Sequence, residues 1–267
     1  MPLSTRSLTT GRAGLLRRLF DHPSLLLPRD FSLFLTGART DAAIERTRRT
    51  SGSRAAFEEA YTRSNDPWAS ASPRYRYQQR KYEQIMSLLP DRPFLRTLDL
   101  GCGLGLLSQR LATRSGSVLG LDVASAALGH ARERATGIAN LTFAQGDILD
   151  LSADMDGGFD LIVLADVLYY LSPLDDRTLK TVSARVANLL KPGGLCLLAN
   201  HFFFWADPDS RQSRRIHDAF TWSPRFAAQG HHRRAFFLAT LLLQQDAEIP
   251  GAALGSPREE FLDPRTV

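Results

Sequence analysis

A glycine-rich turn between a predicted buried strand and a predicted helix constrains this chain more than any other segment. Leu98-Asp99-Leu100 ends an apolar strand, and glycines follow at positions 101, 103 and 105. A turn without Cβ atoms adopts positive φ without strain and lets a ligand approach the backbone closely. Leucines at 104, 107 and 111 then recur with helical spacing, which predicts a helix packed back on a sheet. The segment therefore predicts an α/β domain with a nucleotide-like ligand at this turn.

The spacing of the glycines argues against a dinucleotide. A dinucleotide fingerprint reads Gly-x-Gly-x-x-Gly and places a pyrophosphate at the start of the helix. Here the third glycine comes one residue early, position 106 is Leu, and Asp99 would repel a pyrophosphate. A carboxylate in this place suits a ligand that lacks phosphate and carries positive charge.

Two further acidic strand ends follow in order. Residues 117–122 read as a second strand ending at Asp122, 17 residues beyond Gly105. A carboxylate at that strand tip is able to accept hydrogen bonds from both hydroxyls of a ribose. Residues 141–143 read as a third strand, and Gly146-Asp147-Ile148 follow it. One Asp at a strand end is commonly only a helix N-cap, but three in this order predict a nucleoside site.

The turn and the acidic strand ends resemble motif I and the following motifs of the class I S-adenosylmethionine-dependent methyltransferases. The resemblance implies S-adenosylmethionine as the cofactor, whose ammonium and sulfonium are cationic, so that nearby carboxylates make electrostatic sense. It also implies that the loop at Gly146-Asp147-Ile148 holds the adenine amino group.

Residues 57–171 resemble, more specifically, the nodulation protein S-like branch of these enzymes. The namesake of that branch N-methylates a deacetylated chitooligosaccharide, and its N-terminal helices form a lid over the cofactor. The resemblance implies that Trp68, Tyr77 and Tyr82 line such a lid. Gln78 departs from the acid that the branch has in its Tyr-Glu pair, and residues 1–54 are not part of the pattern. The matching segments are Phe57 to Tyr61, Asp66-Pro67-Trp68, Arg80-Lys81-Tyr82, Leu98 to Gly105 and Val167 to Leu171.

The residue pattern and this resemblance together predict one cofactor site. The cofactor-binding residues expected are Asp99, Gly101, Cys102, Gly103, Gly105, Asp122, Val123, Gly146, Asp147, Ile148, Asp166, Trp68 and Tyr82.

Chemistry is expected at the ends of the fourth and fifth predicted strands, because ligands of open α/β sheets bind at the carboxyl ends of the strands. Asp166 follows residues 159–164 and is a candidate holder of the methionyl end or of a cationic acceptor. Tyr169 and Tyr170 form either an acceptor wall or ordinary aromatic packing. His201 follows residues 195–200 and either accepts the proton of the acceptor or is a satisfied histidine at a strand terminus. The predicted catalytic residues are His201, Asp166 and Tyr169.

The segment after His201 leaves two interpretations open. The run Phe202 to Trp205 is either interior packing or a wall on which a sugar stacks. Residues 207–210 begin a predicted helix, on which Arg214 and Asp218 form an i, i+4 pair on a solvated face. The sharper alternative is that Arg211 or Arg215 recognises an anionic or hydroxyl-rich acceptor. No zinc or iron ligand set is expected, because adjacent histidines at 231 and 232 point to opposite faces of a strand.

The expected fold is a Rossmann-like, doubly wound α/β domain. Its seven-stranded sheet is mostly parallel with an antiparallel last strand, and an N-terminal helical lid covers it. Residues 234–243 read as that antiparallel edge strand. The predicted divisions are a basic, poorly ordered arm at 1–54, the lid at 55–92, the cofactor-binding methyltransferase domain at 93–245 and a tail at 246–267.

Charge and cysteine usage bound the setting of the chain. Residues 1–54 hold ten Arg and four acids, whereas the rest holds 23 basic and 24 acidic side chains. The arm has no continuous apolar run, so no secretory signal is expected, and no apolar run elsewhere reaches the ~20 residues of a membrane span. Cys102 and Cys196 lack disulfide or zinc spacing and are expected to be small buried hydrophobes, which suits a cytoplasmic protein.

The function predicted from these features is S-adenosylmethionine-dependent N- or O-methylation of a small polar acceptor such as an amino sugar or sugar. One alternative is a nucleic-acid methyltransferase that uses the basic arm, although that arm has no Tyr or Trp on which bases would stack. Another is a non-catalytic assembly protein with a cofactor-binding fold. That protein would have a vestigial cofactor site, and the acids retained at positions 99, 122, 147 and 166 argue against one.

Overall fold

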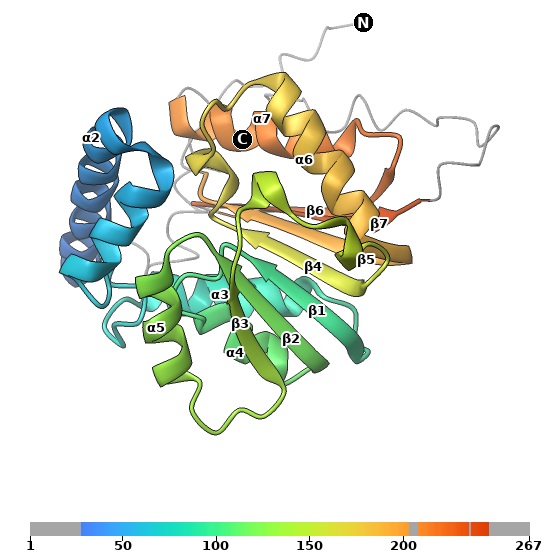
Figure 1. Ribbon diagram of the computed structural model, residues 1–267, viewed down its shortest axis with the longest axis horizontal. Coiled ribbons are helices and arrows are strands. Elements are labelled where there is room, and N and C mark those ends of the chain that lie inside the picture. Colours follow the sequence, from blue (N-terminus) through green and yellow to red (C-terminus); the bar gives the residue numbers. More distant parts are fainter. Residues whose placement is uncertain (1–27, 203–207, 235, 246–267) are drawn as a thin grey trace, which may run out of the picture.

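The computed structural model describes residues 28–202, 208–234 and 236–245 of the 267-residue chain. Its centre is a seven-stranded sheet in the order β3-β2-β1-β4-β5-β7-β6 (Figure 1). The strands β3, β2, β1, β4 and β5 are parallel, and β7 is antiparallel to both of its neighbours. The predicted Rossmann-like sheet is confirmed. Its strands are β1 Phe94–Leu100, β2 Ser115–Asp122, β3 Leu141–Gln145, β4 Phe159–Ala165, β5 Leu190–Asn200, β6 Phe226–Arg234 and β7 Phe237–Gln244.

Helices cover both faces of the sheet, which is why its central strands are apolar on both sides. In β4, Ile162 and Leu164 belong to the core beneath α6 and α7. Leu161 and Val163 belong to the core on the side of α3 and α4. Successive residues of β4 therefore face opposite cores, and the domain has three layers, with the sheet between two layers of helices. The helices are α2 Pro28–Arg63, α3 Arg76–Leu88, α4 Leu106–Ala112, α5 Ser125–Arg134, α6 Asp176–Leu189 and α7 Pro208–Thr221, with 3₁₀ turns η2 Ile148–Asp150, η3 Ala153–Met155 and η4 Leu168–Tyr170.

The last two strands differ from the prediction. We expected residues 234–243 to form the edge, but β7 lies between β5 and β6, so β6 is the edge strand. The sequence of β6, Phe-Ala-Ala-Gln-Gly-His-His-Arg-Arg, has no apolar run, and its pairing shifts between Ala228 and Gly230. A polar, irregular strand is typical of an edge, and such a strand carries no strong sequence signal.

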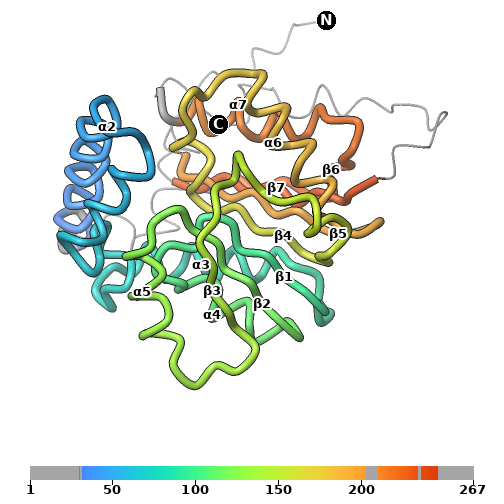
Figure 2. Tube along the Cα trace, in the orientation of Figure 1, coloured from blue at the N-terminus to red at the C-terminus, as the bar shows by residue number. Residues whose placement is uncertain are grey.

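Helix α2 corrects the expectation of a poorly ordered arm. Residues 28–54 are helical, and the helix continues across the predicted boundary to Arg63. Gly52, with φ of +82° and ψ of 168°, divides α2 into two helical segments. Figure 2 shows these segments beside α5 at one end of the molecule. Residues 1–27 and the predicted tail at 246–267 lie outside the described residues.

A buried polar cluster ties α7 to the sheet. The imidazole of His217 contacts Thr240 Oγ1 through Nδ1 at 2.7 Å and Asn200 Oδ1 through Nε2 at 2.9 Å. Burial lowers the pKa of His217 to about 3. Because the unfolded chain binds this proton more readily than the folded one, the stability contribution is present above the ordinary pKa of about 6.5 and is lost as pH falls toward 3.

We therefore expect His217→Gln to weaken the pH dependence of stability. Between pH 6.5 and 4.5 the free energy of unfolding of the parent chain should fall by about 2 kcal/mol more than that of the variant. Urea unfolding at both pH values measures this difference. His232→Gln is the matched control, because His232 is exposed. Equal pH dependence in the parent and His217→Gln would contradict the role of burial.

Candidate functional site

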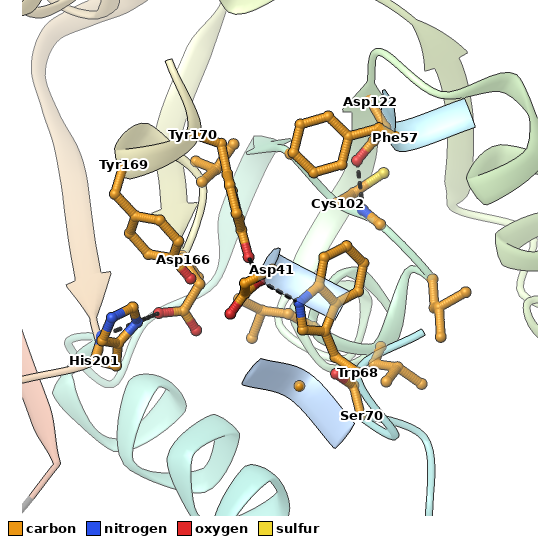
Figure 3. A pocket seen from close by; sticks show the side chains of 18 of the residues that line it. Asp41, Phe57, Trp68, Ser70, Cys102, Asp122, Asp166, Tyr169, Tyr170 and His201 are labelled. Carbon is orange, nitrogen blue, oxygen red and sulfur yellow. Dashed lines mark hydrogen bonds and ion pairs between the residues drawn. The ribbon is translucent and has the colours of Figure 1, made fainter. Parts of the chain in front are cut away.

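A cavity of about 1060 Å³ lies at the carboxyl ends of the parallel strands and is walled by α2 and α3 (Figure 3). Ligand pockets for drug-sized molecules span ~300–1,000 Å³, so this cavity has room for a cofactor and an acceptor together. All the predicted cofactor-binding and catalytic residues line it except Gly105.

The glycine turn needs two of its glycines for close packing. Gly101 has φ of +74°, and a Cβ there would stand 2.3 Å from Val167 Cγ2. Gly103 has φ of +51°, and a Cβ there would stand 2.7 Å from Tyr61 Oη. The backbone N–H groups of Gly101 and Cys102 donate to Leu121 O at 2.8 and 3.0 Å. The turn is thereby fixed to β2, with its bare backbone toward the cavity.

Gly105 does not line the cavity, unlike the other residues expected to bind the cofactor. It is the N-cap of α4 with φ of +70°. A Cβ there would stand 2.6 Å from Phe143 Cζ and 3.2 Å from Ala131 Cβ. Its function is therefore to let Phe143 and α5 pack against the start of α4.

Asp122 ends β2 and provides unused acceptor capacity in the cavity wall. Its carboxylate accepts hydrogen bonds from Gly103 N at 2.8 Å and Ala124 N at 3.0 Å, one on each oxygen. Burial raises the pKa of this carboxyl. A carboxylate accepts about four hydrogen bonds, so two remain for neighbouring hydroxyl groups. This is the arrangement that a ribose diol requires.

Two more carboxylates flank the same end of the cavity. Asp99 is 2% exposed and accepts from Ser108 Oγ at 2.5 Å, and burial raises its pKa to about 6. Asp147 accepts from Leu149 N at 2.9 Å and thereby caps η2. Ile148 and Leu149 then form an apolar wall of the cavity beside Asp147, as a base would need.

A carboxylate on α2 stands among aromatic rings over the cavity. Trp68 Nε1 donates to Asp41 Oδ1 at 2.8 Å, and Tyr170 Oη donates to the same oxygen at 2.7 Å (Figure 3). The rings of Trp68 and Tyr170 lie with centroids 6.2 Å apart, and Phe57 meets Tyr170 edge-on at 5.0 Å. Trp68, which the sequence analysis names, lines this wall, whereas Asp41, whose partner Tyr170 is 129 residues away, is not among the residues it predicts.

Glu58 of α2 caps the N-terminus of α5, and this contact holds α2 in place. Glu58 Oε2 accepts from Ser125 N at 2.7 Å, and its Oε1 accepts from Ser125 Oγ at 2.8 Å and Ala126 N at 3.1 Å. A carboxylate at a helix N-terminus is stabilising because it satisfies free N–H groups and faces the positive end of the dipole. This contact fixes Phe57 and Tyr61, the residues on either side of Glu58 that line the cavity.

The three predicted catalytic residues meet at the ends of β4 and β5. Asp166 has φ of +54°, and its Oδ1 accepts from His201 N at 3.1 Å and lies 3.8 Å from His201 Nδ1. The ring of Tyr169 meets the imidazole of His201 at 4.7 Å. Lys81 Nζ forms an ion pair with Asp166 Oδ2, a contact that sequence reasoning missed although Lys81 lies in a motif it quoted.

Burial sets the protonation behaviour of this group. It lowers the pKa of Lys81 to about 7, a shift that the adjacent Asp166 carboxylate opposes by stabilising the charged amine. It raises the pKa of Tyr169 and Tyr170 well above the usual range. Both phenols therefore stay protonated and act as hydrogen-bond donors.

The predicted roles in the segment after β5 separate in the structure. Arg215 pairs with Asp176 at 2.8 Å, and neither Arg211 nor Arg215 lines the cavity. Arg214 lies 3.8 Å from Asp218, as the helical spacing predicts. Phe202 is buried under Arg233, whose guanidinium lies 4.6 Å from the ring centroid. Residues 203–207 of the aromatic run lie outside the described residues.

Among the described residues, no group of three or more His, Cys, Asp or Glu side chains is placed to hold a metal ion. None of the helices that they form is long and apolar enough to cross a membrane.

Comparison with known proteins gives consistent matches. Residues 92–233 match the family model described as a methyltransferase domain. The chain is 40% identical over 122 residues to trans-aconitate 2-methyltransferase of Deinococcus radiodurans, covering 44% of this chain and 43% of that protein. It is 28% identical over 156 residues to nodulation protein S of Rhizobium tropici, covering 58% and 60%. The chain thus spans about half the length of the curated relatives it matches.

The fold has a solved counterpart. The N-methyltransferase NodS from Bradyrhizobium japonicum, in complex with S-adenosyl-L-homocysteine, superposes with a TM-score of 0.60 at 23% identity, covering 71% of this chain and 99% of that one. The predicted methyltransferase class and its Rossmann-like fold are confirmed by these matches. Because the family model matches more than half of its residues, the chain belongs to the methyltransferase domain family.

Proposed function

We propose that the chain transfers the methyl group of S-adenosylmethionine to a nitrogen or oxygen of a small polar acceptor such as an amino sugar or sugar. The observation that carries this proposal is the single cavity that joins two different environments. One end has the bare glycine turn with spare acceptor capacity on Asp122, and the other has His201 and Asp166 among aromatic rings.

Residues at the first end fit the cofactor. Asp122 would accept hydrogen bonds from the ribose hydroxyls, and Asp147 with Ile148 and Leu149, which line the cavity, would receive the adenine. Asp99 places negative charge beside the cationic end of the molecule. When bound, the cofactor supplies an electrophilic methyl group on a sulfonium.

Residues at the other end orient the acceptor and take its proton. Asp166 holds the backbone N–H of His201 and faces its imidazole, which keeps the ring in place. His201 then accepts the proton that the attacking nitrogen or oxygen loses. Tyr169, Tyr170 and Trp68 exclude water from the path of transfer, an in-line displacement in which positioning supplies much of the rate.

The relatives do not identify the acceptor, because their names assign different substrates: a trans-aconitate methyltransferase and a nodulation protein. A nucleic-acid acceptor was prompted by the basic arm. Part of that arm is α2, whose cavity-facing positions carry Asp30 and Asp41. These carboxylates would repel phosphates, so they favour a small acceptor.

We also propose a cytoplasmic setting for this activity. Cys102 and Cys196 are both buried and free, and burial raises the pKa of both thiols. Inert, unpaired thiols are typical of proteins in a reducing compartment.

The test combines binding with turnover. Calorimetry should detect S-adenosylhomocysteine binding to the full chain. Incubation with methyl-labelled S-adenosylmethionine and a panel of amino sugars, sugars and carboxylic acids should then label at least one acceptor. Absence of S-adenosylhomocysteine binding would overturn the proposal, whereas binding without labelling of any acceptor would favour the non-catalytic alternative.

His201→Gln is expected to lower kcat about 10- to 100-fold, because a neutral amide cannot take the proton of the acceptor. The affinity for S-adenosylhomocysteine should stay within twofold, since His201 lies at the other end of the cavity. Initial rates and calorimetry measure the two quantities, with the exposed His232→Gln as control. An unchanged kcat would exclude His201 as the proton acceptor.

A further inference from the structure

Helix α2 precedes the methyltransferase domain in the sequence, and one of its faces forms part of the cavity wall. Asp30, Phe34, Gly37, Ala38 and Asp41 all line the cavity. Their spacing places them along one side of the helix. The eleven steps along the helix from Asp30 to Asp41 make about three turns, or ~16 Å. Gly37 and Ala38 are small, and a Cβ at Gly37 would stand 3.6 Å from Trp68 Cδ1, so the indole packs against the helix between the two carboxylates.

Asp30 is a buried carboxylate without a partner. It is 2% exposed, and neither of its oxygens has a hydrogen-bond partner. Buried polar groups in folded proteins are nearly always hydrogen-bonded, and an unpaired buried charge is costly. An orphaned carboxylate in a cavity wall therefore indicates a ligand that supplies the missing donor.

Asp41 has capacity left over as well. Both of its hydrogen bonds, from Trp68 and Tyr170, go to Oδ1. Figure 3 shows this carboxylate in the middle of the labelled cavity residues. Among the described residues, no Lys, Arg or His forms an ion pair with Asp30 or Asp41.

The basic groups of the cavity wall do not neutralise these two acids. They are Arg54, which is exposed, Lys81, which pairs with Asp166, and His201, which faces the same Asp166. The α2 end of the cavity is thus anionic. Aromatic rings border it, including the buried Tyr75, and ring faces attract cations.

We propose that the acceptor is a cation: protonated amines of the acceptor bind at Asp30 and at Asp41, beside the neighbouring rings, while another group of the same molecule receives the methyl. This proposal rests on the proposed function and assigns the acceptor class of that site. A protonated amine has no lone pair, so the amines held by the carboxylates are not the group methylated. In the transfer, the sulfur–methyl bond breaks, a bond from the methyl to the nitrogen or oxygen of that other group forms, a thioether remains, and the proton passes to His201.

The test uses spermidine as a linear cationic probe and tetraethylene glycol as an uncharged one. Each is titrated calorimetrically into the full chain saturated with S-adenosylhomocysteine. Spermidine should bind, and the glycol should bind at least tenfold more weakly. Asp41→Asn should weaken spermidine binding about tenfold, because the amide oxygen still accepts from Trp68 and Tyr170 while the charge is lost. Asp30→Asn should have a similar effect, and the double variant should weaken binding further.

Glu59→Gln is the matched control, since Glu59 is another α2 acid, pairs with Arg63 and does not line the cavity. It should leave spermidine binding unchanged. Thermal melting checks folding, and Asp30→Asn should melt no lower than the parent, because it removes an unpaired buried charge. Equal binding of spermidine and glycol, or undiminished spermidine binding by Asp41→Asn, would overturn the proposal. If the parent chain does not bind S-adenosylhomocysteine, the proposed function itself is overturned.

Discussion

Gly101→Ala is expected to lower the free energy of unfolding by about 3–5 kcal/mol, because it combines two costs. The position has φ of +74°, which an L side chain rarely adopts. The new Cβ would also stand 2.3 Å from Val167 Cγ2 and 2.7 Å from Val167 Cβ. A shift of the backbone to relieve this overlap would stretch the hydrogen bond from Gly101 N to Leu121 O, which is 2.8 Å long. Chemical denaturation measures the effect.

Substitutions at two other glycines distinguish the cost of backbone strain from the cost of steric overlap. Gly137 has φ of +89° with open space around its missing Cβ, so Gly137→Ala should cost only about 1 kcal/mol. Gly129 lies inside α5 with nothing nearby, so Gly129→Ala should stabilise by about 0.5–1 kcal/mol. Adding Val167→Ala to Gly101→Ala should restore part of the loss. If Gly101→Ala were no worse than Gly137→Ala, the turn would be less tightly packed than described.

The parts of the fold that the sequence predicted are those with strong local patterns. Residues 98–100 and the apolar run at 159–164 mark central strands, which are buried at positions 97–100 and 161–164. The edge strand β6 was not predicted, because an edge strand that faces solvent does not need apolar residues. The helix at 28–54 was not predicted, because the contacts that stabilise it come from distant segments of the chain.

The site divides in the same way. The end of the cavity proposed for the cofactor follows strand ends in sequence order, so the presence of Asp99, Asp122 and Asp147 there was predictable from spacing. Its acceptor end depends on contacts across the chain: Asp41 meets Tyr170 at a separation of 129 residues, and Glu58 meets Ser125 at 67. A single sequence has no periodicity that reports such pairs.

Asp122→Ala is expected to weaken S-adenosylhomocysteine binding more than 100-fold, about 3 kcal/mol. The change removes a charged acceptor for two ribose hydroxyls and leaves the N–H groups of Gly103 and Ala124 without their acceptor. Asp122→Asn keeps one acceptor oxygen but loses the charge, so its loss should be smaller, about tenfold. Calorimetry with the full chain measures both.

The same carboxyl predicts a pH dependence for binding. Burial raises the pKa of Asp122, and protonation turns one of its acceptor oxygens into a donor. Binding of S-adenosylhomocysteine should therefore weaken as pH falls, and it should begin to weaken at a higher pH than an exposed aspartate with an ordinary pKa would produce. Asp150→Asn is the control, because Asp150 is exposed and does not line the cavity. Binding by Asp122→Ala within threefold of the parent would show that the ribose is held elsewhere, and the proposed placement of the cofactor would then be wrong.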